Sequence, residues 1–278
     1  MIQPYVPWPA LHFMDTEKTL VVTDLHLGFE CELAQMGINL PSQTSKIRDN
    51  LIKLLENSKP NRLIILGDLK HSIPNISNQE WQEIPQFFES ISEKVAKIEL
   101  IPGNHDTGIS RFLRAGLKIA SDRGLLLGKK EKIGFFHGHA WPSPKLFEAD
   151  YWATGHSHPV IQFKGMFSFR TIRPVWVKIP LDGEKIASAF LKHRNVKLNG
   201  KNPTNVLRDK FGVEVKCTNL IVMPAFNDLL GGLALNAKNQ EELKGPLLKC
   251  EGADLNRAEV FLTDGTFIGT LKDLKKFS

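Results

Sequence analysis

The sequence Ile98-Glu99-Leu100-Ile101-Pro102-Gly103-Asn104-His105-Asp106 changes from mainly apolar to polar residues at one Pro-Gly pair. Its first four residues have the length and apolar content of a buried strand, and Pro-Gly ends that strand. Three side chains that bind metals or transfer protons follow directly. Because ligands of open α/β sheets bind beyond the carboxyl ends of the strands, this stretch predicts a functional site where the strand ends.

The same arrangement recurs at four other points of the chain. Further strands are predicted at 19–23, 63–66, 133–136 and 151–154. Polar clusters follow them in the same order: Asp24-Leu25-His26, Gly67-Asp68, His137-Gly138-His139 and Gly155-His156-Ser157-His158. Seven of the nine histidines lie in or just after the five clusters, the exceptions being His12 and His193. Histidines placed by chance would be scattered, so the clusters predict one shared site.

Two predicted helices separate the first three strands. Apolar residues recur at helical spacing on one face, at Ile47, Leu51, Leu54 and Leu55. The capping-box pattern of 77–80 opens a second helix, whose buried face is predicted to hold Trp81, Ile84, Phe88, Ile91 and Val95. Strands that alternate with helices in this way predict an α/β fold.

Beyond His158 the pattern changes. Strands are predicted at 175–179 and 219–223, with few helix-length periodic segments between them, and the tract 195–205 is predicted to be a loop. We therefore expect a single domain over residues 1–278. Its catalytic motifs lie within 19–160, and its C-terminal part, 161–278, is expected to be rich in strands.

The five clusters offer the donor types of a binuclear metal site. Imidazole nitrogens mixed with carboxylate and amide oxygens suit Mn, Fe, Zn or Ni. Two cations about 3.5–4 Å apart repel each other, so a carboxylate must bridge them. Residues two apart on an extended strand point to the same side, so Asp24 and His26 could share one ion, as could His156 and His158. The glycines at 67, 103, 138 and 155 allow sharp turns and close approach of the backbone.

The complete ordered set resembles the calcineurin-like metallophosphoesterase superfamily. A narrower resemblance, to archaeal phosphoesterases related to double-strand-break repair nucleases and to bacterial DNA-ligase-associated phosphoesterases, rests on Gly67-Asp68-Leu69-Lys70-His71 and Pro224-Ala225-Phe226-Asn227. The resemblance implies a four-layer α/β-β/α sandwich, in which two packed mixed β-sheets are flanked by helices. The repair nucleases carry a separate DNA-capping domain after the catalytic core, but only 120 residues follow His158 here, so we expect no large capping domain.

The resemblance also implies a role for each site residue. One divalent ion would bind Asp24, His26 and His158. The other would bind Asn104, His137 and His156, and Asp68 would bridge the two ions. His105 would face the scissile phosphate and donate a proton, and Asp106 would orient it. Manganese is the first expectation for both ions, with Fe, Ni and Zn as alternatives.

Two further histidines keep more than one interpretation. His139 could support a metal ligand or contact phosphate, or it could have no role. His71, three residues after Asp68, could line the site or lie in a surface loop.

The expected function is hydrolysis of a phosphodiester bond in nucleic acid by a two-metal site. An excess of 36 basic over 30 acidic residues, a net charge of +6, is compatible with a polyanionic partner. The alternatives are a small-molecule nucleotide phosphodiesterase or phosphomonoesterase, and a metal-binding scaffold without catalysis. His105 argues against the scaffold, which would need the metal ligands but not the acid. Protein partners cannot be predicted from the sequence.

Cysteine usage and hydropathy favour a cytoplasmic location. Cys31, Cys217 and Cys250 lie far apart and match neither a disulfide framework nor a thiolate zinc site. No stretch of about 18 apolar residues occurs, so no membrane-spanning helix is expected. The N-terminal residues 1–7 lack the basic and apolar regions of a secretory signal.

Overall fold

The predicted strands form two separate sheets in the computed structural model, which describes residues 1–115, 117–164, 170–237 and 245–277. The first sheet has six strands, and their order across the sheet follows the chain. These strands are β1 (Ile2–Pro4), β2 (Leu11–Met14), β3 (Lys18–Val22), β4 (Arg62–Leu66), β5 (Lys97–Ile101) and β6 (Leu117–Ile119).

The second sheet has nine strands among the described residues, and its main path is β13-β10-β11-β12-β9-β8-β7. Strand β14 pairs with β11, and β15 pairs with β14. The bounds are β7 (Leu125–Leu127), β8 (Ile133–Phe135), β9 (Tyr151–Thr154), β10 (Pro159–Lys164), β11 (Arg170–Pro180), β12 (Asn219–Val222), β13 (Leu233–Ala234), β14 (Glu259–Leu262) and β15 (Phe267–Thr270). The C-terminal strands continue this sheet, since β12 pairs with β9.

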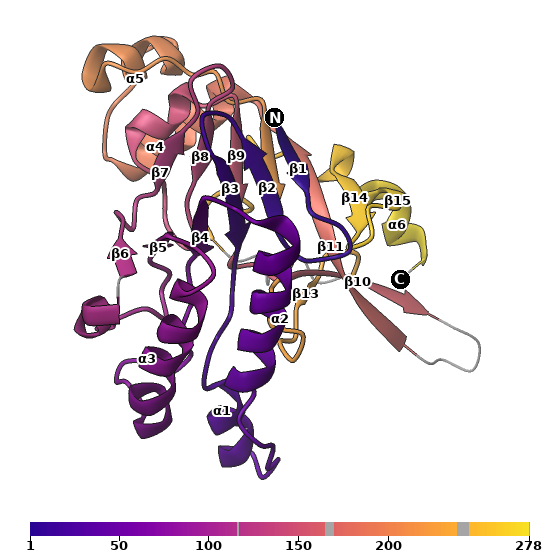
Figure 1. The fold of residues 1–278 in the computed structure, drawn as a ribbon. Coiled ribbons are helices and arrows are strands. Elements are labelled where there is room, and N and C mark those ends of the chain that lie inside the picture. Colours follow the sequence, from indigo (N-terminus) through magenta and orange to yellow (C-terminus); the bar gives the residue numbers. More distant parts are fainter. Residues whose placement is uncertain (116, 165–169, 238–244, 278) are drawn as a thin grey trace.

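The helices complete a four-layer sandwich (Figure 1). They are α1 (Phe29–Gln35), α2 (Thr44–Ser58), α3 (Asn78–Ser92), α4 (Gly183–His193), α5 (Pro203–Phe211) and α6 (Leu271–Leu274). Helices α2 and α3 share an apolar core with the first sheet, and α4 and α5 share one with the second. A third core, between the sheets, contains Val21, Ile64, Phe135 and Trp176. The four-layer arrangement predicted from the motifs is therefore confirmed.

The alternation of side chains along β3 explains why its residues are apolar on both faces. Leu20 and Val22 pack in the core shared with α2 and α3, whereas Val21 packs in the core between the sheets. Side chains of a strand alternate between its two faces, so a strand covered on both sides must be apolar throughout. Such a strand leaves room for polar side chains only where it ends.

Both sheets direct the carboxyl ends of parallel strands to the same site. Strands β3, β4 and β5 are parallel neighbours in the first sheet, and β8, β9 and β12 are parallel neighbours in the second. The five polar clusters follow β3, β4, β5, β8 and β9. The sandwich thus brings together residues that are up to 134 positions apart, from Asp24 to His158.

Two sequence predictions about helices are wrong in part. Trp81 is 42% exposed rather than on the buried face of α3, and Val95 is buried but lies beyond the end of that helix. The predicted loop 195–205 overlaps α5, since Asn202 accepts the backbone N–H groups of Thr204 and Asn205. The Asn-Pro pair therefore caps the start of a helix instead of marking a loop.

Helix α4 was also not expected in the strand-rich C-terminal part. Asp182 caps its first turn, and Ile186, Ala187, Phe190 and Leu191 form its buried face.

Within the described residues, no helix combines the length and the apolar character needed to cross a bilayer.

Candidate metal centre

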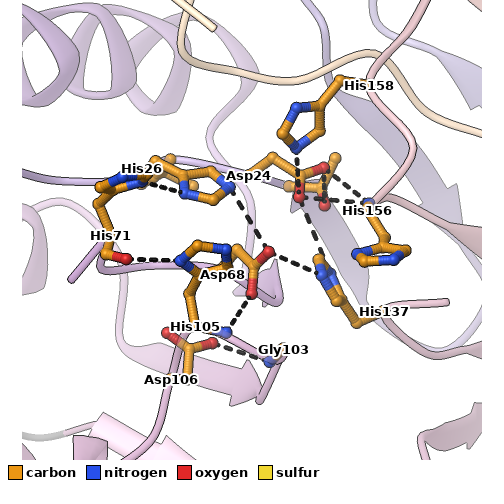
Figure 2. A network of polar contacts seen from close by, with 12 residues as sticks. Asp24, His26, Asp68, His71, Gly103, His105, Asp106, His137, His156 and His158 are labelled. Atoms are coloured by element: carbon orange, nitrogen blue, oxygen red, sulfur yellow. Dashed lines mark hydrogen bonds and ion pairs between the residues drawn. The ribbon is translucent and has the colours of Figure 1, made fainter. Parts of the chain in front are cut away.

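Among the described residues, three groups of side chains could each hold a metal ion, one of them being His26, His71 and His105. The other two groups each contain a motif aspartate and lie next to each other at the carboxyl ends of the strands (Figure 2). In each group, the potential ligand atoms lie within 4.8 Å of one another. The first group is Asp24, His26 and His158, and the second is Asp68, His137 and His156. The Oδ2 atom of Asp68 lies 3.0 Å from Nε2 of His137 and 3.5 Å from Nε2 of His26. This carboxylate therefore lies between the two groups, as the bridging role requires.

The donor atoms fit divalent cations. Among the described residues, the Nε2 atoms of His26, His137 and His158 are buried and make no hydrogen bond of good geometry, although carboxylate oxygens of Asp68 and Asp24 lie 3.0–3.5 Å away. A buried polar atom without a partner is costly, so such atoms call for an explanation. Two cations, one in each group, would satisfy all three nitrogens together with the adjoining carboxylates.

When these rings are neutral, the hydrogen bonds of the opposite ring nitrogens keep the proton away from Nε2. Nδ1 of His137 lies 3.0 Å from the carbonyl oxygen of Leu66. A carbonyl oxygen can only accept, so Nδ1 carries the proton and donates it there. The lone pair of Nε2 is then available to a metal, which is how structures commonly fix a ligating imidazole.

His26 is fixed by a longer chain of contacts. Glu32 Oε2 accepts from Nε2 of His71 at 2.5 Å, and Nδ1 of His71 lies 3.0 Å from Nδ1 of His26. Because Glu32 holds the proton of His71 on Nε2, Nδ1 of His71 accepts from His26. His26 therefore carries its proton on Nδ1 and presents a bare Nε2 toward Asp68. Glu32 belongs to no motif, so no sequence pattern indicates its role.

Burial and charge set the protonation states that metal ligands need. Burial lowers the pKa of His26 to about 3, and burial together with the charge of His137 lowers that of His156 to about 3. Burial raises the pKa of Asp68, but the stronger effect of His137 and His26 holds it well below the usual range. The site thus offers two neutral imidazoles and an ionised carboxylate, the forms that bind cations.

His137 has the opposite shift in the metal-free protein. Burial lowers its pKa, but the charges of Asp68 and Asp24 outweigh burial and raise it to about 9. A proton on His137 takes the place of a cation between these carboxylates, and a metal must displace it.

Five of the predicted ligands adopt left-handed backbone conformations that non-glycine residues seldom use. Their φ angles lie between 40° and 65°, at Asp24, His26, Asp68, His156 and His158. Asp24 and His26 do share a group, but not by alternating along an extended strand, because β3 ends at Val22. The same spacing does not bring His156 and His158 together, since they lie in different groups. The surrounding loops hold these conformations, which cost about 1–3 kcal/mol each.

Two motif glycines are required by close approach rather than by an unusual φ. A Cβ atom on Gly103 would lie 2.1 Å from Oδ1 of Asp68, and one on Gly155 would lie 1.9 Å from Oγ1 of Thr23. Neither residue could carry a side chain unless the ligand loops moved apart.

His105 lies at the site, but its contacts differ from the expected ones. Its Nδ1 donates to the carbonyl oxygen of His71, and its backbone N–H donates to Oδ1 of Asp68 at 2.9 Å. The role of orienting His105, which the resemblance gave to Asp106, therefore belongs to the His71 carbonyl.

Asp106 instead fixes the loops around His105. Its buried carboxylate accepts the backbone N–H groups of Gly103, Leu69 and Lys70. Burial, with the charge of Asp68, raises the pKa of Asp106 to about 7. Asp106 accepts from backbone instead of contacting the His105 ring because its carboxylate points inward from its loop, toward these N–H groups.

The Pro-Ala-Phe-Asn motif supports the first ligand loop from the second sheet. Phe226 N–H donates to the carbonyl oxygen of Thr23 at 2.9 Å. The buried Asn227 side chain donates from Nδ2 to the carbonyl oxygen of Leu25 at 2.9 Å, and its Oδ1 accepts the N–H of Leu229. The motif thus braces the loop that carries Asp24 and His26.

The remaining predicted residues fall in different places. Asn104 is exposed and lines a cleft of about 630 Å³ over the two ligand groups, together with His71 and His105. His71 therefore lines the site. His139 lies beside His137, with ring centroids 5.4 Å apart, and its buried Nδ1 has no hydrogen-bond partner within the described part of the chain. The cleft also contains Lys249, an exposed cation that sequence reasoning missed because it belongs to no motif.

Comparisons with known proteins agree with this fold. The family model of the calcineurin-like phosphoesterases matches residues 17–160. The structure of the nuclease MPE from Pseudomonas putida is similar over 95% of this chain and 98% of that chain, with a TM-score of 0.51 and 17% identity. A phosphoesterase from E. coli, Yfce, aligns with 53% of this chain and 73% of its own, with a TM-score of 0.35 and 20% identity. A search of curated proteins finds no significant match.

Proposed function

The chain belongs to the calcineurin-like phosphoesterase family, and from this premise we propose that it cleaves phosphodiester bonds of nucleic acid with two divalent cations. Hydrolysis of phosphoester bonds follows from the family. The observation that carries the two-metal proposal is the position of Asp68, whose carboxylate lies between two groups of ligand atoms. Manganese as the native metal, and a cytoplasmic location, remain predictions.

Each cation would be held by one ligand group. Asp24, His26 and His158 would bind the first cation, and His137 and His156 would bind the second, with Asp68 shared. Asn104 lines the same cleft and would add an amide oxygen to the second site. Cations bound at these positions would supply positive charge to phosphoryl oxygens and would lower the pKa of the attacking water.

His105 is the residue proposed to protonate the leaving oxygen. Its Nδ1 proton is committed to the His71 carbonyl, so the neutral ring presents an unprotonated Nε2. His105 would therefore donate from Nε2 only when the ring carries a proton on both nitrogens. Asp106 acts as a positioning residue, because it holds the backbone of the two loops around His105.

Nucleic acid is favoured as the substrate by charge and by the cleft. The net charge is +6, and the exposed Lys249 lies in the wall of the ligand cleft. The similarity to the Pseudomonas nuclease concerns the fold alone, so it adds no support for this substrate. A polyanion would be attracted to such a surface, and a groove that continues past the metals would accept a strand.

Three substrates assayed in parallel test the proposal. We expect Mn-dependent hydrolysis of bis-(p-nitrophenyl) phosphate and of single-stranded DNA, with much slower hydrolysis of p-nitrophenyl phosphate. Faster hydrolysis of small nucleotides than of any oligonucleotide would favour the small-molecule alternative. Bound metal without hydrolysis of any substrate would favour the non-catalytic scaffold.

A further inference from the structure

A second cleft adjoins the metal centre on the side of His158. It has a volume of about 490 Å³, and we call it the side cleft; its walls include Trp8, Val160, Ile172, Pro174 and Phe226. The side cleft and the ligand cleft have three lining residues in common: His158, Leu230 and Gly231. A molecule bound at the metals can therefore extend past His158 into the side cleft.

The walls of the side cleft suit a flat apolar group. They combine an indole ring, a phenyl ring and several prolines, at Trp8, Phe226, Pro7, Pro9 and Pro174. The one carboxylate among the lining residues, Asp228, is paired with Lys46 at 2.7 Å. Nucleobases bind to such surfaces by stacking, without regard to sequence.

The strand register shows where the wall of the side cleft continues. Along the antiparallel β10–β11 pair, Val160 lies opposite Pro174, Gln162 opposite Ile172, and Lys164 opposite Arg170. Residues directly opposite each other share a face, and so do residues two apart on one strand. Lys164 and Arg170 therefore lie on the face that lines the side cleft, at the outer end of a ribbon that projects from the body (Figure 1).

The positively charged side chains of Lys164 and Arg170 have no acidic partner in the part of the chain that the structure describes. Lys164 is four residues beyond Val160, which corresponds to about 13 Å of extended strand. This distance is too long for contact with a phosphate at the metals, but it suits a phosphate further along the same strand.

We propose that the side cleft binds the nucleoside next to the scissile phosphate, and that Lys164 and Arg170 bind a later phosphate of the same single strand. This inference rests on the proposed action on nucleic acid, and it adds the direction in which the strand leaves the metals. The strand would run from the ligand cleft over Leu230 and Gly231, past Trp8, and then along the outer face of the ribbon.

The ribbon provides matched controls on its opposite face. Arg173 lies opposite Ile161, and Thr171 lies opposite Phe163, so both residues face away from the side cleft. Arg170→Ala and Arg173→Ala remove the same charge from the same ribbon. Ile172→Ala and Thr171→Ala each shorten an exposed side chain beside them.

Binding of a fluorescent single-stranded decanucleotide to the chelator-treated protein is measured by anisotropy at several salt concentrations. We expect Arg170→Ala to weaken binding about threefold or more, and to reduce the slope of log affinity against log salt by about 0.7. Arg173→Ala should change neither quantity. Trp8→Ala should weaken binding by about fivefold or more, and Trp8→Phe should restore much of it. Ile172→Ala should weaken binding more than Thr171→Ala does.

The same variants are then assayed with the metal-loaded enzyme. The ratio of kcat/KM for the oligonucleotide to that for bis-(p-nitrophenyl) phosphate should fall in Arg170→Ala and stay constant in Arg173→Ala. Equal losses in the two arginine variants would overturn the proposed path, because any cation would then serve. A wild-type protein that hydrolyses bis-(p-nitrophenyl) phosphate but neither binds nor cleaves the oligonucleotide would instead refute the proposed action on nucleic acid.

Discussion

Asn227→Ala should weaken metal binding although Asn227 is not a ligand. The side chain is 2% exposed and makes two hydrogen bonds to backbone, a buried one to Leu25 and a partly buried one from Leu229. Alanine would leave both backbone groups without partners, at about 1–2 kcal/mol each, so we expect a loss of about 2–4 kcal/mol in the free energy of unfolding. The loop that carries Asp24 and His26 would lose its brace. Groups that position metal ligands typically contribute 10–100-fold to affinity, so a decrease of about tenfold or more is expected.

Asn236→Ala is the matched control for this variant. Asn236 is also 2% exposed and makes two hydrogen bonds to backbone, both with Gln162 on β10. Urea unfolding in the presence of a chelator should show similar losses of stability in the two variants. Titration with Mn²⁺ should show weaker binding in Asn227→Ala alone. Equal metal affinity in the two variants would refute the idea that the Pro-Ala-Phe-Asn motif positions the ligand loop.

Three further predictions follow from the geometry of the centre. His105→Ala should keep two metal ions but lower kcat about a hundredfold or more, whereas His156→Ala should lose metal. Elemental analysis together with kinetics distinguishes the two variants, and loss of an ion from His105→Ala would contradict the proposed role of His105. The pKa of His137 is raised to about 9 in the metal-free protein, so metal binding at pH 7 should release a proton, and the affinity for metal should rise with pH up to about 9. Calorimetry in buffers of different ionisation enthalpy measures this proton release. Gly103→Ala should destabilise the protein by about 1–3 kcal/mol in urea, because its Cβ would lie 2.1 Å from Oδ1 of Asp68; unchanged stability would show that the ligand loops move freely.

The strands and most of the site could be predicted because burial on both faces leaves a clear sequence pattern. Strands β3, β4 and β5 are apolar runs, and each meets its first metal-ligating residue within three positions of its end. Parallel strands then bring those ends together whatever the length of the connections. The grouping of Asp24 with His158, 134 positions later, follows from this rule and from the second sheet.

The parts that could not be predicted depend on the path of the backbone after the strands. Asp106 was expected to orient His105, but the turn after β5 aims its carboxylate at backbone N–H groups. Glu32 and Lys249 reach the site from segments without a motif, so only the folded chain shows them. The start of α5 at Pro203 was missed because Asn-Pro is common both in turns and at helix starts.

The position of two ions around Asp68 tests the central claim most directly. Crystals of the Mn²⁺-loaded protein should give two anomalous peaks about 3.5–4 Å apart, one on each side of the Asp68 carboxylate. Asp68→Asn, which keeps the shape of the side chain but removes its charge, should lose both peaks and turnover together. One ion in the wild type, an ion held by His26, His71 and His105 instead, or two ions and full activity in Asp68→Asn would contradict the account.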